Sequence, residues 1–563
     1  MRLMEKQILL ANAHFTSSIT ASSSKSYSFP STLTFLLSLA LTIYFNSHAV
    51  GFTVSVDCVR GFNFSAKSGE IGERGDEFEY LWFTRVTIHK GIAQREEIRN
   101  MDANSLISNK RQKQHEREGS TMINDLPDEL LQKIICKLLI RETVRTTVLS
   151  KRWKNKWTEI PEVKLVQDAH GKREQFLEFV EKLLGVFNTL CLKKLCLACD
   201  VCKDTPQVNR WLSSFIHPNI EELKLDFERV EEQLVFPNHL FYNKSLTHFH
   251  LSMPHVINLP SLISFSILST LTLKHVIFPD TSKTQQLFSS CPCLENLTLI
   301  DCNWMNVRAV SILNPSLQTL IIREWRDDDD DENDAVGQNV QTYCQIAITG
   351  CNLKTFSYDG DLINDYILYS TASVTDGAVE VHPPPNNTLN AGKFALKLLK
   401  ALSNVEKLSI SDFTVEALCC ASSLITDIPL FNNLVELSVV SAAPVNLACD
   451  ALMTIFRNSP ILETVEFITG ISMPKNDLNN IGPLPTCFET HLTTIRIYGF
   501  TGTEEEMLAI KFLLQSTPHL DALFVHINPR NFDSTAGSKM LNRLFKQIIQ
   551  FPSASEDRGI YFE

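Results

Sequence analysis

The chain has 563 residues, more than one ordinary hydrophobic core holds, so two or more folded units are predicted. Its 52 basic and 64 acidic residues give a net charge of -12, which repels phosphate backbones and disfavours nucleic-acid binding outside a local basic patch. The 15 cysteines are odd in number and scattered through apolar stretches. This pattern favours buried thiols in the cytoplasm or nucleus over a disulfide framework.

Residues 1–120 are predicted to be disordered, or to be an upstream extension that the working protein does not use. A short apolar segment at 33–45 lies in a stretch without charged residues. Its length suits the core of a signal peptide and falls short of the roughly 20 apolar residues of a membrane span. A membrane or targeting role stays open, because basic residues precede the segment and would direct the following chain out of the cytosol.

A helical module is predicted at 121–165. In its first helix, apolar residues recur every four positions and form a broad stripe. Pro127 is expected in the first turn, and Asp128 and Glu129 suit the positive end of the helix dipole. The stripe consists of Leu126, Leu130, Ile134 and Leu138, with Leu131 and Ile135 beside them.

Two further short helices complete this module. One is expected over 141–149, and Ser150 can cap another that carries Trp153 and Trp157 on one face. Three short helices bury too little apolar surface to be stable alone. The module is therefore expected to dock against another domain or another chain.

The run INDLPDELLQKIICKLLIRETVRTTVLSKRWKNKW at 123–157 strongly resembles an F-box of the form common in plant proteins. The matching motifs lie at 126–130 and 144–153. One departure is Leu139-Ile140, where relatives usually have Leu-Pro. The resemblance implies that the module grips a Skp-family adaptor of a cullin-based ubiquitin ligase. The residues that it places at or behind the gripping surface are Leu126, Pro127, Leu130, Ile134, Val144, Leu149 and Trp153.

The basic residues around the two tryptophans in 144–157 allow two other interpretations. They could form a handle for nucleic acid, or the segment could be a helical hairpin packed on its own protein. The acidic balance of the chain disfavours the first. The F-box resemblance favours a solvated or adaptor-facing basic rim, with the tryptophans as core and anchor.

A short phrase, apolar-x-x-apolar-x-apolar, returns twelve times from LKKLCL at 192 to LDALFV at 520. The steps run from 22 to 36 residues, with one of 52 that leaves room for a degenerate copy near 373–381. This period is the signature of leucine-rich repeats. Stacked copies share one core and align their strands as a parallel sheet lining a horseshoe. The predicted fold is α/β, a three-helix F-box followed by a repeat solenoid at 190–485.

Strand geometry separates inward-facing from outward-facing side chains in each copy. In LENLTLIDC at 294–302, Leu297 and Leu299 are expected to face the core, and Cys302 to occupy the Asn/Cys position after the strand. The outward face carries both signs of charge and no concentrated basic pocket, which favours a protein target over a phosphorylated small molecule. The residues expected to face that target are Lys224, His248, His250, Lys274, Lys407, Arg496 and Tyr498.

Two segments raise the question of metal binding, and the sequence favours no metal in either. The acidic loop at 326–337 lacks the glycine and spaced ligands of a calcium loop, so a solvated, self-repelling loop is expected. The cysteines at 191–202 could form a zinc site, but Cys196 lies inside a strand phrase and the usual pair of C-x-x-C knuckles is absent.

The C-terminal region, 486–563, is similar to the FBD region that ends many plant F-box and leucine-rich-repeat proteins. The matching parts are IYGFTG at 497–502, a helix near 504–516, and FPSAS at 551–555. With the F-box, the resemblance covers residues 123–563. The FBD match names a family and implies little chemistry.

The sequence contains no catalytic motif, and no enzymatic activity or cofactor is predicted. The resemblance implies the substrate-recognition subunit of an SCF-type E3 ubiquitin ligase. The F-box would bind the Skp-family adaptor and through it a cullin, and the repeats would bind an unidentified protein destined for ubiquitination. A membrane-anchored or secreted repeat receptor or scaffold is the alternative, suggested by the apolar segment and by sequons at Asn243 and Asn296.

Overall fold

The chain divides into two compact units, Met1–Ile160 and Pro161–Glu563. The computed structural model describes residues 52–58, 84–90, 120–121, 126–136, 138, 140–148, 150–153, 158, 160–167, 173–187, 189–325, 343–382, 388–475, 482–527, 535–555 and 558–562. The apolar segment at 33–45 and the acidic loop at 326–337 lie outside these residues.

The N-terminal unit contains a small antiparallel sheet and the helical module. Strand β1 (Phe52–Cys58) pairs with β2 (Thr84–Lys90), which pairs with β3 (Ser120–Thr121). The module contains α3 (Asp128–Ile135), α4 (Ile140–Arg145) and the 3-10 turn η2 (Thr146–Val148). Of the third predicted helix, 151–153 form a turn and 154–157 lie outside the described residues.

Helix α3 differs in one respect from the sequence prediction. Pro127 is the N-cap with extended backbone and does not belong to the first turn, because the ψ angle of 150° keeps it out of the helix. Its carbonyl accepts hydrogen bonds from the N–H groups of Leu130 and Leu131, each at 3.1 Å. The residue before the helix thus satisfies two of the first backbone donors.

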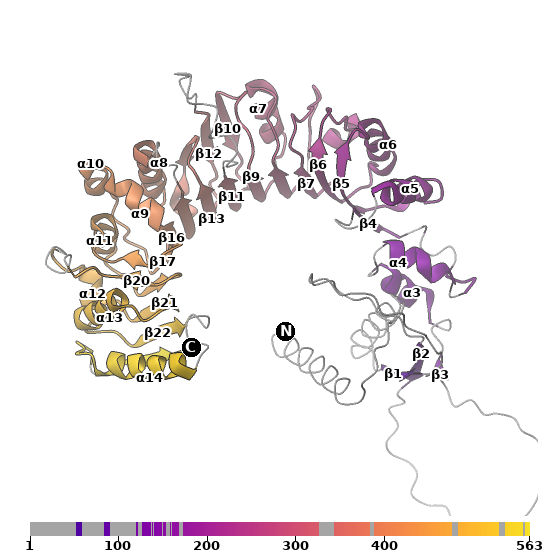
Figure 1. The fold of residues 1–563 in the computed structure, drawn as a ribbon. Helices are drawn as coiled ribbons and strands as arrows, with labels where there is room; N and C mark the ends of the chain where they lie inside the picture. The colour runs from indigo at the N-terminus through magenta and orange to yellow at the C-terminus, as the bar shows by residue number, and fades with distance from the viewer. Residues whose placement is uncertain are drawn as a thin grey trace, which may run out of the picture. The chain divides into compact units, whose positions relative to one another are not determined.

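The C-terminal unit is built on one sheet of fifteen parallel strands that follow one another in chain order. Five further short strands of this unit, β10, β12, β14, β18 and β20, lie outside that sheet. Its strands line the inner side of an arc and its helices lie on the outer side (Figure 1). The strands are β4 (Glu162–Val166), β5 (Lys194–Cys202), β6 (Glu222–Val230), β7 (His248–Ser252), β8 (Thr270–Lys274), β9 (Asn296–Ile300), β11 (Thr319–Glu324), β13 (Thr355–Gly360), β15 (Asp376–Val381), β16 (Lys407–Ser411), β17 (Glu436–Val440), β19 (Thr464–Phe467), β21 (Thr494–Phe500), β22 (Ala522–Ile527) and β23 (Gly559–Phe562).

Every repeat phrase of the sequence becomes a strand, and the degenerate copy near 373–381 becomes β15. The expected alternation is confirmed in β9, where Leu297 and Leu299 are buried and their neighbours are partly exposed. Cys302 is buried, and its thiol donates to the carbonyl of Leu273 in the preceding copy at 3.4 Å. The sheet also includes β4, before the first phrase, and β23, in the FBD-like region.

The outer layer consists mainly of helices, which cover the apolar ends of the repeats (Figure 1). They are α5 (Arg173–Leu184), α6 (Thr205–Phe215), α7 (Thr281–Ser289), α8 (Thr388–Ala401), α9 (Asp412–Cys419), α10 (Ser422–Thr426), α11 (Asp450–Arg457), α12 (Thr486–Thr490), α13 (Glu504–Ser516) and α14 (Thr535–Gln550). Short 3-10 turns, η4 (Thr189–Cys191), η5 (Asn238–Tyr242) and η7 (Thr371–Ser373), replace helices in other copies.

In three copies a short strand accompanies the main sheet. Strands β10 (Ala309–Leu313), β12 (Gln345–Thr349) and β14 (Asp365–Tyr369) form a second parallel sheet. A smaller pair joins β18 (Val445–Asn446) and β20 (Ile471–Ser472). The sequence analysis did not predict these strands.

The IYGFTG motif of the FBD-like region ends β21 and leads into α13, whose N-cap is Thr503. Gly499 and Gly502 have φ angles of +72° and +80°, which side-chain-bearing residues adopt at a cost. The buried carboxylate of Glu506 accepts hydrogen bonds from the backbone of Thr501 and Thr503, and Thr503 completes a capping box with it. The motif therefore encodes a sharp strand-to-helix turn with satisfied backbone donors.

A buried carboxylate joins the two parallel sheets. Glu324, at the end of β11, accepts hydrogen bonds from the hydroxyl groups of Tyr358 at 2.9 Å and Tyr366, and from the Asn364 amide at 2.9 Å. Burial raises the pKa of Glu324, and these donors oppose the shift. Gly360 must be glycine beside it, because a Cβ atom there would lie 2.0 Å from the Glu324 carbonyl oxygen.

Replacing Glu324 tests this network. A raised pKa means that the folded state holds the proton more tightly, so its contribution is complete below the ordinary value of 4.5 and is lost as pH rises through the folded pKa. As pH rises above 4.5, we expect the unfolding free energy of Glu324→Gln to fall less steeply than that of the wild type. Urea denaturation at several pH values measures this difference. Glu324→Ala should cost about 3 kcal/mol or more, because it leaves three buried donors unpaired. An unchanged pH profile for Glu324→Gln would contradict the assignment.

Candidate functional site

The residues predicted to bind an adaptor divide into a buried group and an accessible group. Leu126, Ile134 and Trp153 are buried, with Trp153 completely inaccessible. Pro127 is exposed, and Leu130 and Val144 are partly exposed; Leu149 lies outside the described residues. Among the described members of this set, the accessible ones are therefore Pro127 and Leu130 at the start of α3 and Val144 on α4.

Polar contacts fix the segments that carry these residues. Arg152 forms an ion pair with Asp128 in the first turn of α3, with the Nε atom 3.1 Å from the carboxylate. The Thr146 hydroxyl donates to the Thr143 carbonyl at 2.7 Å, and both threonines are buried. The Arg152–Asp128 pair joins the turn at 151–153 to the first turn of α3, and the Trp153 side chain of that turn is fully buried.

Replacing Trp153 tests whether its side chain forms the core of the helical module. We expect Trp153→Ala to lower the stability of the helical module by about 3–5 kcal/mol, since it empties a fully buried aromatic site. Lys151→Ala, at an exposed position in the same turn, should change stability by less than about 0.5 kcal/mol. Hydrogen exchange of the α3 amides measures both. Protection that survives Trp153→Ala would show that this side chain is not the core of the module.

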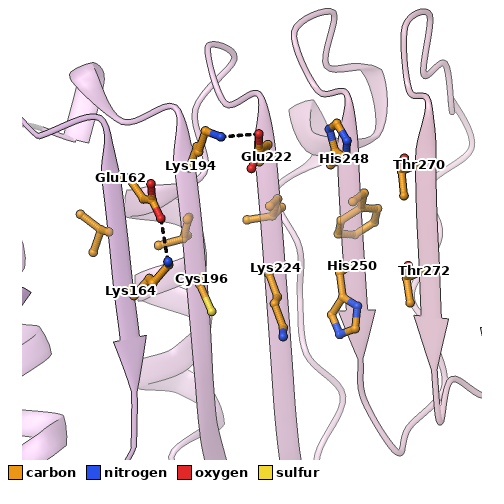
Figure 2. Close-up of a pocket in the computed structure, with 14 residues that line it drawn as sticks. Glu162, Lys164, Lys194, Cys196, Glu222, Lys224, His248, His250, Thr270 and Thr272 are labelled. Carbon is orange, nitrogen blue, oxygen red and sulfur yellow. Dashed lines mark hydrogen bonds and ion pairs between the residues drawn. The ribbon is translucent and has the colours of Figure 1, made fainter. Parts of the chain in front are cut away.

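The concave face of the repeats carries a shallow groove across β4 to β8, with a volume of about 440 Å³ (Figure 2). The strands run in register, so outward side chains form two rows across them. The first row is Glu162, Lys194, Glu222, His248 and Thr270, and the second is Lys164, Cys196, Lys224, His250 and Thr272.

The two rows differ in charge. In the first row, Lys194 pairs with Glu222 at 2.5 Å, and Glu162 is the row's second acidic residue. The second row contains no acidic residue, and its Lys164 is paired with Glu162 at 2.9 Å. Lys224 makes no ion pair with any other residue in the described part of the chain. It is therefore the cation in this groove that is left to meet a partner.

His250 lies beside Lys224 on the next strand and adds an unsatisfied polar atom. Its Nε2 atom is buried and has no hydrogen-bond partner among the described residues. Burial lowers the pKa of His250, the charges of Lys224 and Lys274 lower it further, and Asp226 opposes them. The neutral ring and the lysine thus present hydrogen-bonding capacity and positive charge at the same point of the groove (Figure 2).

The seven residues predicted to face a target do not form one site. Lys224, His248 and His250 line the groove, and Lys274 lies on the last of its strands, β8. The other three are engaged elsewhere on the sheet by neighbouring side chains. Lys407 pairs with Glu436 at 2.7 Å, Arg496 pairs with Glu466 at 3.0 Å, and Tyr498 stacks on His526 at 4.1 Å.

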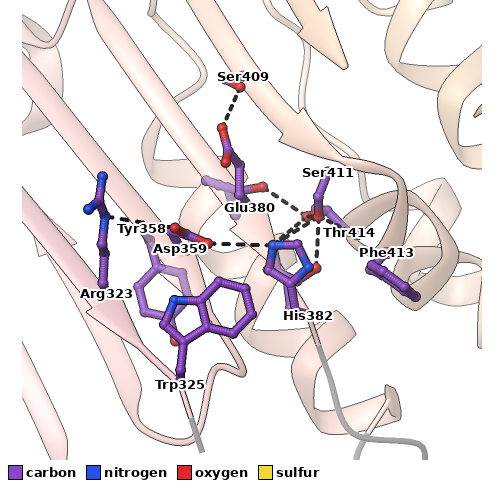
Figure 3. Close-up of polar contacts among 12 residues, drawn as sticks. Arg323, Trp325, Tyr358, Asp359, Glu380, His382, Ser409, Ser411, Phe413 and Thr414 are labelled. Carbon is purple, nitrogen blue, oxygen red and sulfur yellow. Dashed lines mark hydrogen bonds and ion pairs between the residues drawn. The ribbon is translucent and has the colours of Figure 1, made fainter. Parts of the chain in front are cut away.

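The structure adds an aromatic cluster that the sequence analysis missed, defined by Trp325, His382 and Phe413 (Figure 3). The rings of Trp325 and His382 stack at 4.8 Å, and Phe413 meets His382 edge-on at 5.7 Å. Trp325 and Phe413 are 49% and 38% exposed, which is unusual for aromatic rings this close together.

A carboxylate holds the aromatic cluster at the sheet edge. Asp359 lies 3.5 Å from His382 Nε2 and 3.8 Å from Arg323 Nε. The members follow the ends of β11, β15 and β16, so they meet only because parallel strands end at the same edge. Aligning the repeats on their strands, with attention to the residue just after each strand, could have revealed Trp325 and His382.

The structure bears on the metal and membrane interpretations of the sequence. No three His, Cys, Asp or Glu residues of the described part of the chain gather as a metal site would require. Cys191 lies in η4, and the other three cysteines of the zinc interpretation lie along β5. No helix of the described residues is long and apolar enough to cross a membrane.

The sequons behind the receptor interpretation lie in structured surroundings. Asn243 is 2% exposed, and its amide donates to the His217 carbonyl at 3.2 Å while its oxygen accepts from Ser245 N–H at 2.7 Å. Asn296 lies within β9 and is partly exposed. A glycan on Asn243 would have to displace these hydrogen bonds, which disfavours glycosylation there.

Comparisons with known proteins bear directly on these surfaces. An F-box domain matches residues 123–163, a family described as "FBD-associated F-box protein At5g56370, LRR repeats" matches 208–336, and FBD matches 482–523. The chain carries the F-box, the leucine-rich repeats and the FBD region of the plant F-box/FBD/leucine-rich-repeat proteins.

Similar proteins come from Arabidopsis thaliana. "F-box protein At3g59000" is 26% identical over 480 residues, 76% of this chain and 92% of that protein. "FBD-associated F-box protein At5g22730" is 25% identical over 428 residues, 73% and 88% of the two chains. "F-box/FBD/LRR-repeat protein At5g22660" is 23% identical over 423 residues, 71% and 88%. The F-box implies binding to the Skp1 adaptor in an SCF complex and a substrate-adaptor role, typically without catalysis.

Proposed function

We propose that this F-box/FBD/leucine-rich-repeat protein is the substrate-recognition subunit of an SCF-type E3 ubiquitin ligase, acting in the cytoplasm or nucleus. The F-box binds the Skp-family adaptor and through it a cullin, and the repeats bind a protein target. The observation that carries the proposal is the pairing of an F-box with an exposed Pro127 edge and a repeat face with an unpaired cation. The proposal keeps the predicted domain boundaries, which are 121–165 for the F-box, 190–485 for the repeats and 486–563 for the FBD-like region.

The chain's contribution to ubiquitination is positional. Holding a target next to the transferring subunit converts a dilute encounter into an effectively intramolecular reaction. This requires one surface for the adaptor and another for the target, and both must remain accessible at once. The F-box edge and the groove of β4 to β8 belong to different compact units of the chain, as two separate docking functions require.

The adaptor-facing edge is proposed to consist of Pro127, Leu130 and Val144. These side chains are accessible, apolar and fixed by the buried residues behind them. An apolar edge on a small module buries surface efficiently against a partner groove, because little side-chain entropy is lost at proline. Lys151 is exposed in the turn that follows, and its charge adds electrostatic steering toward an acidic partner.

We expect Pro127→Ala with Leu130→Ala to weaken copurification of a Skp-family adaptor at least about tenfold, because the accessible apolar contacts are lost. Leu126 is avoided, since it is 9% exposed and its truncation would also disturb folding. Gln132→Ala with Lys133→Ala, both exposed on α3, is the matched control and should leave binding unchanged. Full adaptor binding by the first variant would show that the edge is elsewhere.

The target-facing surface is proposed to be the groove of β4 to β8, and the target to present a carboxylate to it. Lys224 supplies an unpaired charge, and the buried Nε2 atom of His250 lacks a partner that an incoming polar group can supply. Satisfying a buried polar atom on binding strengthens the complex, and leaving it unsatisfied weakens it. Lys407 and Arg496 offer less, because their charges are already neutralised within the sheet.

We expect Lys224→Glu to reduce ubiquitination of the targets at least about tenfold, since it places like charges together at the contact. Lys407→Ala, which removes an ion-paired lysine from the same face, should have little effect. The measurement is quantitative ubiquitin-remnant mass spectrometry in cells that lack the endogenous chain and express each variant. Adaptor copurification serves as the folding control. Equal losses for both variants would place the target site outside the groove.

A further inference from the structure

Two cysteines from neighbouring repeats meet in the outer layer of the C-terminal unit. Cys419 is the last residue of α9, and Cys449 is the N-cap of α11. Their sulfur atoms lie 3.2 Å apart although 30 residues separate them in the chain. A disulfide bond needs about 2.0 Å between the sulfurs. A movement of little more than 1 Å therefore separates these two free thiols from a covalent link.

The surroundings of the pair favour a reactive thiolate on Cys449. The hydrogen bond from Cys419 lowers the pKa of Cys449 to about 7. The Cys449 side chain makes no capping hydrogen bond at the start of α11. The N–H groups of Leu452 and Ala451 also lower the pKa of Cys449, whereas burial and the charge of Asp450 raise it. The thiolate is the nucleophile in thiol chemistry, so Cys449 is the attacking sulfur.

The pair is also accessible, unlike the structural thiols of this protein. Cys419 is exposed and Cys449 is partly exposed. By contrast, burial raises the pKa of Cys291 and Cys302 to about 12, which keeps them protonated and unreactive. Cys420, next in the chain, turns its thiol to the Glu416 carbonyl at 3.7 Å.

We propose that Cys419 and Cys449 form a site of reversible oxidation by hydrogen peroxide. The Cys449 thiolate attacks one peroxide oxygen, the O–O bond breaks, and Cys449 becomes a sulfenic acid as the first water forms. The Cys419 sulfur then attacks the Cys449 sulfur, the S–O bond breaks, and the second water leaves with the Cys419 proton. Two thiols lose two electrons in total, and one peroxide is reduced to two waters.

The resulting disulfide links the end of α9 to the start of α11. The start of α9 is tied to the sheet, because Ser411 caps the helix and the hydroxyl groups of Ser411 and Thr414 accept hydrogen bonds from the Val381 N–H on β15. The cross-link joins the copies that contain β16 and β17, on the side opposite the groove-bearing face. The inference is independent of the proposed adaptor and target contacts.

The test uses the full-length reduced chain treated with a small molar excess of hydrogen peroxide. Digestion at glutamate separates the thiols into fragments 417–436 and 437–463, so a disulfide appears as a linked pair under non-reducing mass spectrometry. We expect this linked pair in the wild type and its loss on reduction. Cys420→Ser should retain the pair, since that thiol faces away from Cys449. Cys449→Ala should abolish it.

A further variant keeps the inference testable if Cys449→Ala disturbs folding. Cys419→Ala removes the resolving thiol, so the Cys449 sulfenic acid should persist and be trapped by dimedone. The same substitution should slow iodoacetamide alkylation of Cys449 at pH 7 about tenfold, since the pKa of Cys449 returns toward its ordinary value. A wild-type chain that stays fully reduced, or a link formed by Cys420, would overturn the proposal.

Discussion

The structure depends on one constraint: no repeat can bury its own apolar face, so each copy must align its strand with the next in strict register. Leu297 pairs across the sheet with Leu271 on one side and Leu320 on the other. A shift of one residue would turn every leucine outward. The same register places the outward side chains of successive copies in continuous rows. The chemistry of the concave face is therefore decided by which residue each copy carries at two positions.

Those rows explain why similar lysines on one face differ in what they can do. Where an acidic residue occupies the equivalent position of the adjacent copy, as Glu436 does beside Lys407, the charge is neutralised within the sheet. Where the neighbours are Cys196 and His250, as beside Lys224, the charge stays available. Exposed ion pairs contribute little stability. For the proposed target site, the larger effect of these ion pairs is on specificity, because a lysine or arginine that is already paired is less available to bind a target.

Much of the repeat fold could be predicted because its signal is periodic and local: apolar spacing located the strands, including β15 in the longest gap. The second sheet was missed because β10, β12 and β14 lie between the phrases, in copies of irregular length. The site was harder to predict. Pairing of Lys407 and the stacking of Trp325 on His382 depend on side chains from different copies, which no single copy reveals. Motif spacing also does not reveal that Pro127 is exposed while Trp153 is fully buried.

The repeat architecture also separates two kinds of chemistry within the C-terminal unit. The proposed target site lies on the inner face, where strands hold side chains in rows. The outer layer is made of helix ends, where backbone N–H groups are free to stabilise a thiolate. A link between Cys419 and Cys449 would tie two outer helices without touching the rows. Because the curvature of such an array is the sum of small rotations between copies, restraining one outer junction can change the spacing of strands on the inner face. Target binding and thiol oxidation would then be coupled through the curvature of the array, although neither site contacts the other.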